Sequence, residues 1–298
     1  MIGPKFTAAA TLALAGTLLS AQAPGSFITI DVPGAASTGS AVGRVRLKMN
    51  PQGQIVGGYS DTLGKEHGFL LSKGNVTTFD YPGAVFTTLC DISPSGDTLL
   101  GIYQDANLIL HGFLLSNGNL STIDVPGAIS TVPPAGCGVG CGTQPLGLSP
   151  AGDVGGVFND TSGRFHGFVL SGGIFTQIDF PGAVFTSVQT VSAGQILGVE
   201  ISGGVVHGYL LVNGAFTQLD VPGAVRTAPI DINPEGTIVG QYFTPDGKNH
   251  GFKLKAGQFT TVDVPGAVFN FASGINPQGT IVGKYETPDG KFHGYELR

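Results

Sequence analysis

The sequence predicts an all-β protein: a six-bladed β-propeller of four-stranded blades, closed by the N-terminal strand pairing with the C-terminal strand. Three observations predict this fold. The composition is rich in glycine yet apolar, one sequence unit occurs six times, and turn signals divide each unit into four short apolar stretches.

The composition excludes several other classes of protein. The 298 residues include 49 Gly and 19 Pro, yet 41% are hydrophobic and only 11% charged. Glycine usually makes up about 7% of a chain, and so much Gly and Pro would break helices. Disorder requires low hydrophobicity and high net charge, and collagen requires Gly at every third residue. A net charge of −6 disfavours nucleic acid, which needs a basic face.

The N-terminus has the pattern of a secretory signal peptide over residues 1–21. Lys5 supplies the positive charge, Phe6 to Leu19 the apolar stretch, and Ala21 a small residue at the cleavage point. A membrane span needs about 20 apolar residues, so the alternative of a retained membrane anchor is disfavoured. We expect residues 22–298 to form one six-repeat domain that is secreted, to the extracellular space or the periplasm, without membrane insertion after cleavage.

Three short boxes recur along the chain in one fixed order, and a period of this length is typical of propellers and solenoids. The third box is Asn/Ser-Pro-x-Gly followed by an aliphatic pair and Gly, as in Asn276 to Gly283, with variants from Ser149 and Ser192. The first box, Asp-x-Pro-Gly-Ala, begins at Asp31, Asp80, Asp124, Asp179, Asp220 and Asp263. The second box, His-Gly-aromatic, begins at His67, His111, His166, His207, His250 and His293.

Each unit contains four predicted strands, which the last unit illustrates. They are Phe259 to Val264, Phe269 to Ile275, Thr280 to Tyr285 and His293 to Leu297. Turns rich in Pro and Gly separate them, because Pro presets φ and Gly accepts positive φ. Four strands in about 43 residues match the size of a propeller blade.

The register follows from the two-residue turn between the fourth strand of one unit and the first strand of the next. With Lys73-Gly74 as that turn, Ser72 pairs with Asn75, and outward counting places His67 opposite Asp80. This position is a non-hydrogen-bonded pair, in which side chains approach closely. The same construction pairs His111 with Asp124, His166 with Asp179, His207 with Asp220, and His250 with Asp263.

The first and last strands have no hairpin partner of their own. Pairing them would close a ring, with His293 opposite Asp31 and Leu297 opposite Phe27. Closure removes open sheet edges, which invite aggregation. A β-solenoid or a sandwich-like stack is the alternative, although a solenoid usually needs distinct capping units.

These boxes resemble the bacterial extracellular repeat family named HAF, after its His-Ala-Phe box. The resemblance lies in the aliphatic-Gly-x-Tyr run, the His-small-aromatic-x-Leu strand and the following Pro-Gly, as in His250 to Leu254. Here Gly stands in the middle of the box, and the Trp that often follows in the family is missing. The resemblance covers essentially the whole mature chain and implies an exported protein, without an activity or catalytic residues to carry over.

The repeated His and Asp residues are interpreted as structural. A catalytic residue is normally unique, whereas these occur in every copy. A partly buried His–Asp pair should raise the pKa of the His. The Asp box offers one carboxylate per copy, while calcium needs several oxygen ligands. We therefore expect no metal, no cofactor and no catalytic residue among them.

Two features depart from the repeat. Cys137 and Cys141 lie in an insertion at about residues 132–143, where we expect a local disulfide, while Cys90 falls in a predicted strand as a buried thiol. Arg44, Arg46 and Lys48 alternate in the inner strand of the first unit, as a solvated edge or as one side of an anion site at the channel. Alignment on the Asn/Ser-Pro turn places Lys48 level with Asp91, Gly147, Thr190, Asp231 and Gly274.

These observations favour an exported non-catalytic protein that acts as a binding or structural scaffold for an unknown ligand or protein partner. The candidate ligand-binding residues are Lys48, Asp91, Thr190 and Asp231, with Arg44 and Arg46 beside them. The alternatives are a propeller-type hydrolase or lyase with a site at the central channel, and a surface component that assembles with itself. We expect a monomer that binds no nucleic acid.

Overall fold

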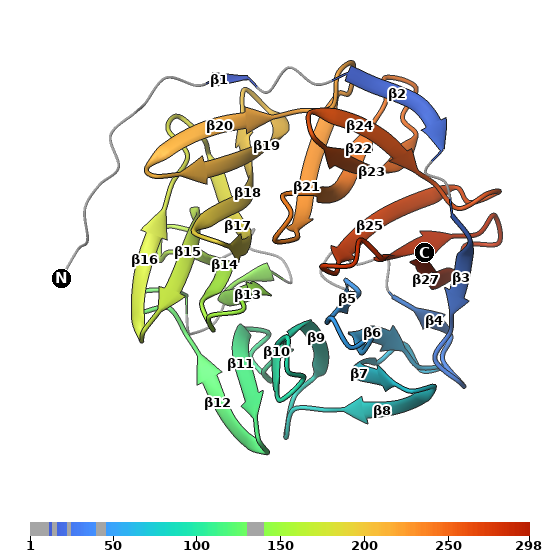
Figure 1. Ribbon diagram of the computed structural model, residues 1–298. Coiled ribbons are helices and arrows are strands. Elements are labelled where there is room, and N and C mark those ends of the chain that lie inside the picture. The colour runs from blue at the N-terminus through green and yellow to red at the C-terminus, as the bar shows by residue number, and fades with distance from the viewer. Residues whose placement is uncertain (1–11, 14–16, 23–24, 40–45, 130–139) are drawn as a thin grey trace.

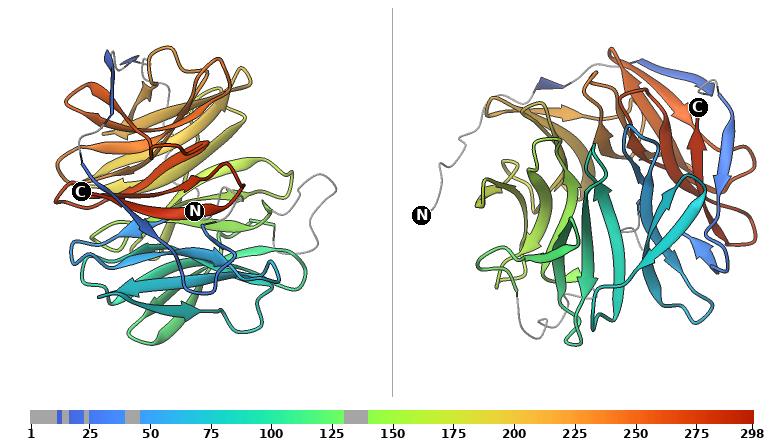
Figure 2. Two further views of the ribbon diagram at one scale, coloured as in Figure 1. Left: turned by 90° about the vertical axis from the view of Figure 1, so that its right-hand side faces the viewer. Right: turned by 60° about the horizontal axis from the view of Figure 1, so that its bottom comes forward.

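The computed structural model describes residues 12–13, 17–22, 25–39, 46–129 and 140–298. These ranges form β-strands and no α-helix, so the described part contains no helix that could span a membrane. The strands make antiparallel sheets that stand like blades around a central axis (Figure 1). The fold is therefore an all-β propeller, and Figure 2 shows its sheets edge-on.

Each blade repeats four strand positions from the axis outwards (Figure 1). The innermost strands are β5 (Lys48–Met49), β9 (Phe86–Ile92), β13 (Thr143–Leu148), β17 (Phe185–Ser192), β21 (Arg226–Ile232) and β25 (Phe269–Ile275). The second strands are β6 (Ile55–Ser60), β10 (Thr98–Gln104), β14 (Val154–Asn159), β18 (Gln195–Ser202), β22 (Ile238–Phe243) and β26 (Ile281–Glu286). The third strands are β7 (Glu66–Ser72), β11 (Leu110–Ser116), β15 (Phe165–Ser171), β19 (Val205–Val212), β23 (Asn249–Lys255) and β27 (Phe292–Leu297). The outer strands are β8 (Asn75–Phe79), β12 (Asn119–Ile123), β16 (Ile174–Ile178), β20 (Ala215–Leu219), β24 (Gln258–Val262) and β3 (Phe27–Ile30).

Two blades share a continuous sheet. A single parallel bridge between Phe165 and Phe185 joins β13–β16 to β17–β20, so that these strands and β1 (Leu12–Ala13) count as one sheet of nine strands. Another short strand, β4 (Ser37–Thr38), pairs with β6 on the same edge as β5. Apart from these short strands and the N-terminal strand that pairs with β24, strand order and pairing are those of separate four-stranded blades.

The predicted hairpin register is present. Ser72 pairs with Asn75 and Leu71 with Val76, and the turn residues Lys73 and Gly74 have φ of 50° and 79°. Positive φ at both positions is the geometry of a type I′ turn, whose twist matches that of the two strands. The turn therefore fixes which side chains of the third and outer strands face each other.

The first and last blade strands pair as predicted. β3 lies antiparallel to β27, with Leu297 opposite Phe27 and Gly294 opposite Ile30 (Figure 1). The N-terminal strand thus completes the blade that the C-terminal strands begin. Because of this closure, β27 has a paired strand on both sides, β26 and β3.

The aromatic residue of the His-Gly-aromatic box fills the core of each blade. Its six copies are fully buried: Phe69, Phe113, Phe168, Tyr209, Phe252 and Tyr295. Each ring lies over a glycine of the second strand, and at Gly101 a Cβ would be only 2.2 Å from Cζ of Phe113. Glycine is therefore required there by the ring that covers it, which explains part of the unusual glycine content.

The N-terminal segment lies on the outside of the propeller. β1 pairs in parallel with β20, and β2 (Thr17–Gln22) pairs in parallel with β24 (Figure 1). Both strands fall within or at the edge of the predicted signal peptide. Their pairings belong to the uncleaved chain, and the cleavage at about Ala21 stays a prediction.

Candidate functional site at the mouth of the central channel

The inner strands carry a repeated irregularity close to the axis. In β9 the register shifts so that Cys90 has no partner in β10, and the same bulge occurs in β13, β17, β21 and β25. Such bulges redirect the side chain that follows them. The residues at this level, each paired with the residue before the second-strand glycine, are Lys48, Asp91, Gly147, Thr190, Asp231 and Gly274.

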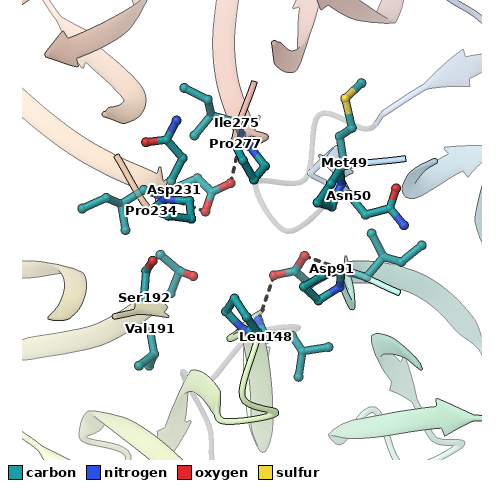
Figure 3. Close-up of a pocket in the computed structure, with 17 residues that line it drawn as sticks. Met49, Asn50, Asp91, Leu148, Val191, Ser192, Asp231, Pro234, Ile275 and Pro277 are labelled. Carbon is teal, nitrogen blue, oxygen red and sulfur yellow. Dashed lines mark hydrogen bonds between the residues drawn. The ribbon is translucent and has the colours of Figure 1, made fainter. Parts of the chain in front are cut away.

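Asp91 and Asp231 are held in the same way in opposite parts of the channel (Figure 3). The Asp91 carboxylate accepts hydrogen bonds from the backbone N–H of Ile92 and of Leu148 in the next blade, both at 2.8 Å. The Asp231 carboxylate accepts the corresponding bonds from Ile232 and Ile275, both at 3.0 Å. Each carboxylate therefore ties two neighbouring blades together.

The two carboxylates differ in their charged neighbours. Lys48 Nζ lies 2.9 Å from Asp231 Oδ1, and the Lys48 side chain is 2% exposed. Among the ion pairs of the described residues, none involves Asp91. Burial raises the pKa of Asp91 to about 6, while the charge of Lys48 and the two backbone hydrogen bonds oppose that rise and the charge of Asp231 adds to it.

A second buried cation lies near this level. Arg46 donates a hydrogen bond to the side-chain oxygen of Gln189, the bulge residue of β17, on the opposite side of the ring. Burial lowers the pKa of Arg46 to about 10, so the side chain stays charged at neutral pH. Cys90 is a buried free thiol whose pKa burial raises to about 12, as expected for a structural cysteine. Arg44 lies outside the described residues.

The mouth of the channel holds a small cavity of about 90 Å³ (Figure 3). Asp91, Asp231 and Thr190 line it together with aliphatic side chains such as Leu148 and Ile275. Its rim is formed by the prolines of the turns between first and second strands, namely Pro51, Pro94, Pro150, Pro234 and Pro277. The arrangement combines an apolar wall with carboxylates that still have free acceptor positions.

The structure places every predicted His–Asp pair in contact. His Nδ1 lies 2.6–2.8 Å from an Asp carboxylate oxygen in all six, and His293 meets Asp31 across the closing strands. In three blades His Nε2 also approaches an Asp of the preceding turn, as His67 does with Asp61 at 3.3 Å. No group of His, Cys, Asp or Glu in the described part could hold a metal ion. This geometry supports the structural interpretation.

The His111–Asp124 pair should make stability depend on pH. The hydrogen bond to Asp124 raises the pKa of His111 above 6.5, although burial opposes this. A raised folded-state pKa stabilises the fold fully below the unfolded pKa and loses that contribution as pH rises through the folded value. Urea unfolding of wild type and His111→Gln between pH 5 and 9 should therefore show a stability difference that shrinks with rising pH. A difference that stays constant over this range would contradict the pairing energetics.

Sequence reasoning missed Glu200, which breaks a pattern in the second strands. In the other blades an aromatic ring stacks on the imidazole, as Tyr59 does on His67 with ring centroids 5.1 Å apart. Glu200 faces His207 instead, is fully buried, and has one carboxylate oxygen without a hydrogen-bond partner. Burial raises the pKa of Glu200. Alignment of the six units would have shown Glu in this aromatic column.

Replacing Glu200 with phenylalanine should stabilise the protein. In the β13–β16 blade, Phe158 already packs against His166, and Gln177 lies on the outer strand opposite Phe168. Gln218 occupies the matching place, opposite Tyr209. Removing a buried unpartnered acceptor is worth about 1–3 kcal/mol. Because the pKa of Glu200 is raised, the gain should grow from acidic to neutral pH. Glu200→Gln, which keeps the shape, is the control, and equal melting temperatures for wild type and Glu200→Phe would refute the prediction.

The inserted loop is only partly described. Cys137 lies outside the described residues, so the disulfide with Cys141 stays a prediction. Cys141 itself is buried in a small cluster with Ile109 and Ile129. The cluster shows that the end of the insertion packs onto the β9–β12 blade.

Solved structures with a similar fold are β-propellers. No protein-family model matches the chain, and no curated protein matches it. A putative TolB from Agrobacterium tumefaciens is 12% identical, with a TM-score of 0.59 over 84% of this chain and 88% of that one. AofleA from Arthrobotrys oligospora is 13% identical, with a TM-score of 0.57 over 97% and 90%. The Aleuria aurantia lectin, a six-bladed β-propeller that recognises fucose, is 12% identical, with a TM-score of 0.53 over 88% and 93%. At such identities the likeness shows the propeller fold alone.

Proposed function

We propose that this chain is an exported, non-catalytic binding propeller of six blades, and that its ligand site is the mouth of the central channel. The blade count rests on the six sequence units and on the single bridge that links two units in the nine-stranded sheet. The similar lectin is itself described as six-bladed. Export rests on the N-terminal pattern of residues 1–21 and on the resemblance to extracellular repeats.

One observation carries the choice of site. In a repeat protein, residues that recur in every unit serve the fold, and the His–Asp pairs do so here. The channel level instead varies from unit to unit. It buries Asp91 and Lys48 and leaves Asp231 13% exposed at the cavity. Buried charge costs stability, and proteins tolerate such costs where function needs them.

Binding accounts for the geometry better than catalysis. A hydrolase or lyase would need an acid and a base that are free to exchange protons. Asp91 and Asp231 each accept hydrogen bonds from two backbone N–H groups, and Asp231 also forms an ion pair with Lys48. Fixed acceptors of this kind suit recognition of a ligand that donates hydrogen bonds.

A thermal-shift screen tests the proposal. Wild type and Asp91→Asn are screened against inorganic cations, amines, organic anions and sugars, with Asp246→Asn as control. Asp246 is an exposed turn residue at the opposite end of the blades, where second and third strands connect. We expect at least one class to raise the melting temperature of wild type and the control but not of Asp91→Asn. If every stabilising class acts equally on all three proteins, the mouth is not the site.

A further inference from the structure

The channel mouth has an approximate two-fold repeat within its ring of blades. In ring order the residues at the channel level read Lys48, Asp91, Gly147, Thr190, Asp231 and Gly274. One half of the ring therefore reads Asp91, Gly147, Thr190. The other half reads Asp231, Gly274 and, across the closure of the ring, Lys48. The two halves of the mouth should then be alike except where Thr190 replaces Lys48.

The backbone geometry supports this repeat. Each Asp accepts one N–H from the residue after it and one from the residue after the Gly of the next blade. A Cβ on Gly147 would lie 2.9 Å from Cα of Thr190, and a Cβ on Gly274 would lie 3.1 Å from Cα of Lys48. Thr190 and Lys48 thus occupy matching places beside matching glycines.

The two halves differ in what faces the carboxylate. Lys48 brings an ammonium group to 2.9 Å from Asp231. Thr190 is too short to do the same for Asp91, which uses two acceptor positions for backbone N–H groups. A carboxylate has about four such positions. Asp91 therefore keeps acceptor capacity, and no ammonium of the described residues lies as close to it as Lys48 lies to Asp231.

The cavity walls suit the rest of such a group. The lysine side chain is an ammonium on a four-carbon stem. The cavity that Asp91 lines also has aliphatic and proline side chains in its wall, among them Leu148, Ile92 and Pro150. A cavity of about 90 Å³ has room for an alkyl stem. Stem and head group would each meet a matching surface.

We propose that the Asp91–Thr190 half of the mouth binds a primary alkylammonium group, which takes the place that Lys48 occupies in the other half. The inference rests on the proposed function and names its ligand class. The ammonium donates to the free acceptor positions of Asp91, and the stem lies against the proline rim. An anion has no place there, because the backbone N–H groups of Ile92 and Leu148 already serve the carboxylate.

The charges around Asp91 set the pH range of binding. The groups packed near it are Arg46 and Lys48 from the first unit, Cys90 on its own strand, and Asp231 across the channel. The two cations oppose a further positive charge, and Asp231 favours it. Because the pKa of Asp91 is about 6, binding should weaken as pH falls through that value.

The test uses n-butylammonium, which has the length of a lysine side chain, and tetramethylammonium, which has the charge but no N–H donor. Melting temperatures are measured for wild type, Thr190→Lys and Lys48→Thr. At about ten times its Kd, butylammonium should raise the melting temperature of wild type by about 2 °C, and tetramethylammonium should not. Thr190→Lys should not respond, because its own ammonium fills the site. Lys48→Thr should bind two butylammonium ions by titration calorimetry, one beside each Asp.

The outcomes separate this inference from the proposed function. Equal responses of wild type and Thr190→Lys, or equal effects of both ions, overturn the ammonium site. If butylammonium fails while another class acts on wild type but not on Asp91→Asn, the inference is wrong and the binding function stands. If no class acts through Asp91, both fail. If Lys48→Thr folds poorly, the comparison between wild type and Thr190→Lys still decides the outcome.

Two further probes assign the source of the group. Cadaverine represents free diamines, and a Gly-Lys-Gly peptide blocked at both ends represents a lysine of a protein partner. Preference for cadaverine points to a small molecule, and preference for the peptide points to a protein. Failure of both, while butylammonium binds, would contradict a natural alkylammonium ligand at this cavity.

Discussion

Replacing Lys48 with threonine is expected to lower the free energy of unfolding by about 3–5 kcal/mol at neutral pH, because the substitution leaves the largely buried Asp231 carboxylate without its ammonium partner. Removing one member of a buried ion pair costs more than the pair itself contributes. The measurement is urea unfolding of wild type and variant at pH 7.

A double-mutant cycle provides the control. Asp231→Asn removes the charge that Lys48 neutralises, so adding it to Lys48→Thr should recover part of the lost stability. Asp231→Asn keeps the side-chain shape and one acceptor oxygen for the backbone. If Lys48→Thr is as stable as wild type, the Lys48–Asp231 ion pair does not stabilise the fold. Lys48 would then not serve as the model for an ammonium beside Asp91.

Replacing Phe113 with alanine is expected to cost about 3–5 kcal/mol. Phe113 is fully buried and packs with Val56, Leu89 and Ile92, which come from two neighbouring blades. Its ring also covers Gly101, where its Cζ and Cε1 are the two atoms nearest to the position of a Cβ. Loss of the ring therefore opens a cavity at the joint between blades, and thermal unfolding should report it.

Leu120→Ala is the matched control for this prediction. Leu120 lies on the outer strand β12 of the same blade and is 38% exposed. Its truncation should cost well below 1 kcal/mol, since surface substitutions usually do. Similar losses for Phe113→Ala and Leu120→Ala would mean that the aromatic of the repeat box does not hold the blades together.

The propeller could be derived from the sequence because Pro and Gly residues mark the turns in each unit. Lys73-Gly74 fixed a hairpin register that placed His67 beside Asp80, and the unpaired ends of the chain indicated the β3–β27 closure. These features are local, since turn chemistry and alternation act over a few residues. The same reasoning placed Lys48, Asp91 and Asp231 at one level of the channel.

The details of the site required the structure. The Lys48–Asp231 ion pair joins two inner strands far apart in the sequence, and the hydrogen bond from Leu148 to Asp91 depends on how one blade meets the next. Glu200 was visible as a residue, but its burial without a partner follows only from packing. Periodicity fixes which residues share a face, whereas contacts between blades depend on the bulges and on the size of neighbouring side chains.

An amide NMR titration tests the central claim, that the Asp91 half of the channel mouth binds an alkylammonium group. The backbone N–H groups of Ile92 and Leu148 donate to Asp91, and those of Ile232 and Ile275 donate to Asp231, so the second pair is an internal control. With n-butylammonium and wild-type protein, we predict large shifts for Ile92 and Leu148 and small shifts for Ile232 and Ile275. Shifts confined to the outer strands, or equal shifts for both pairs, would contradict the account.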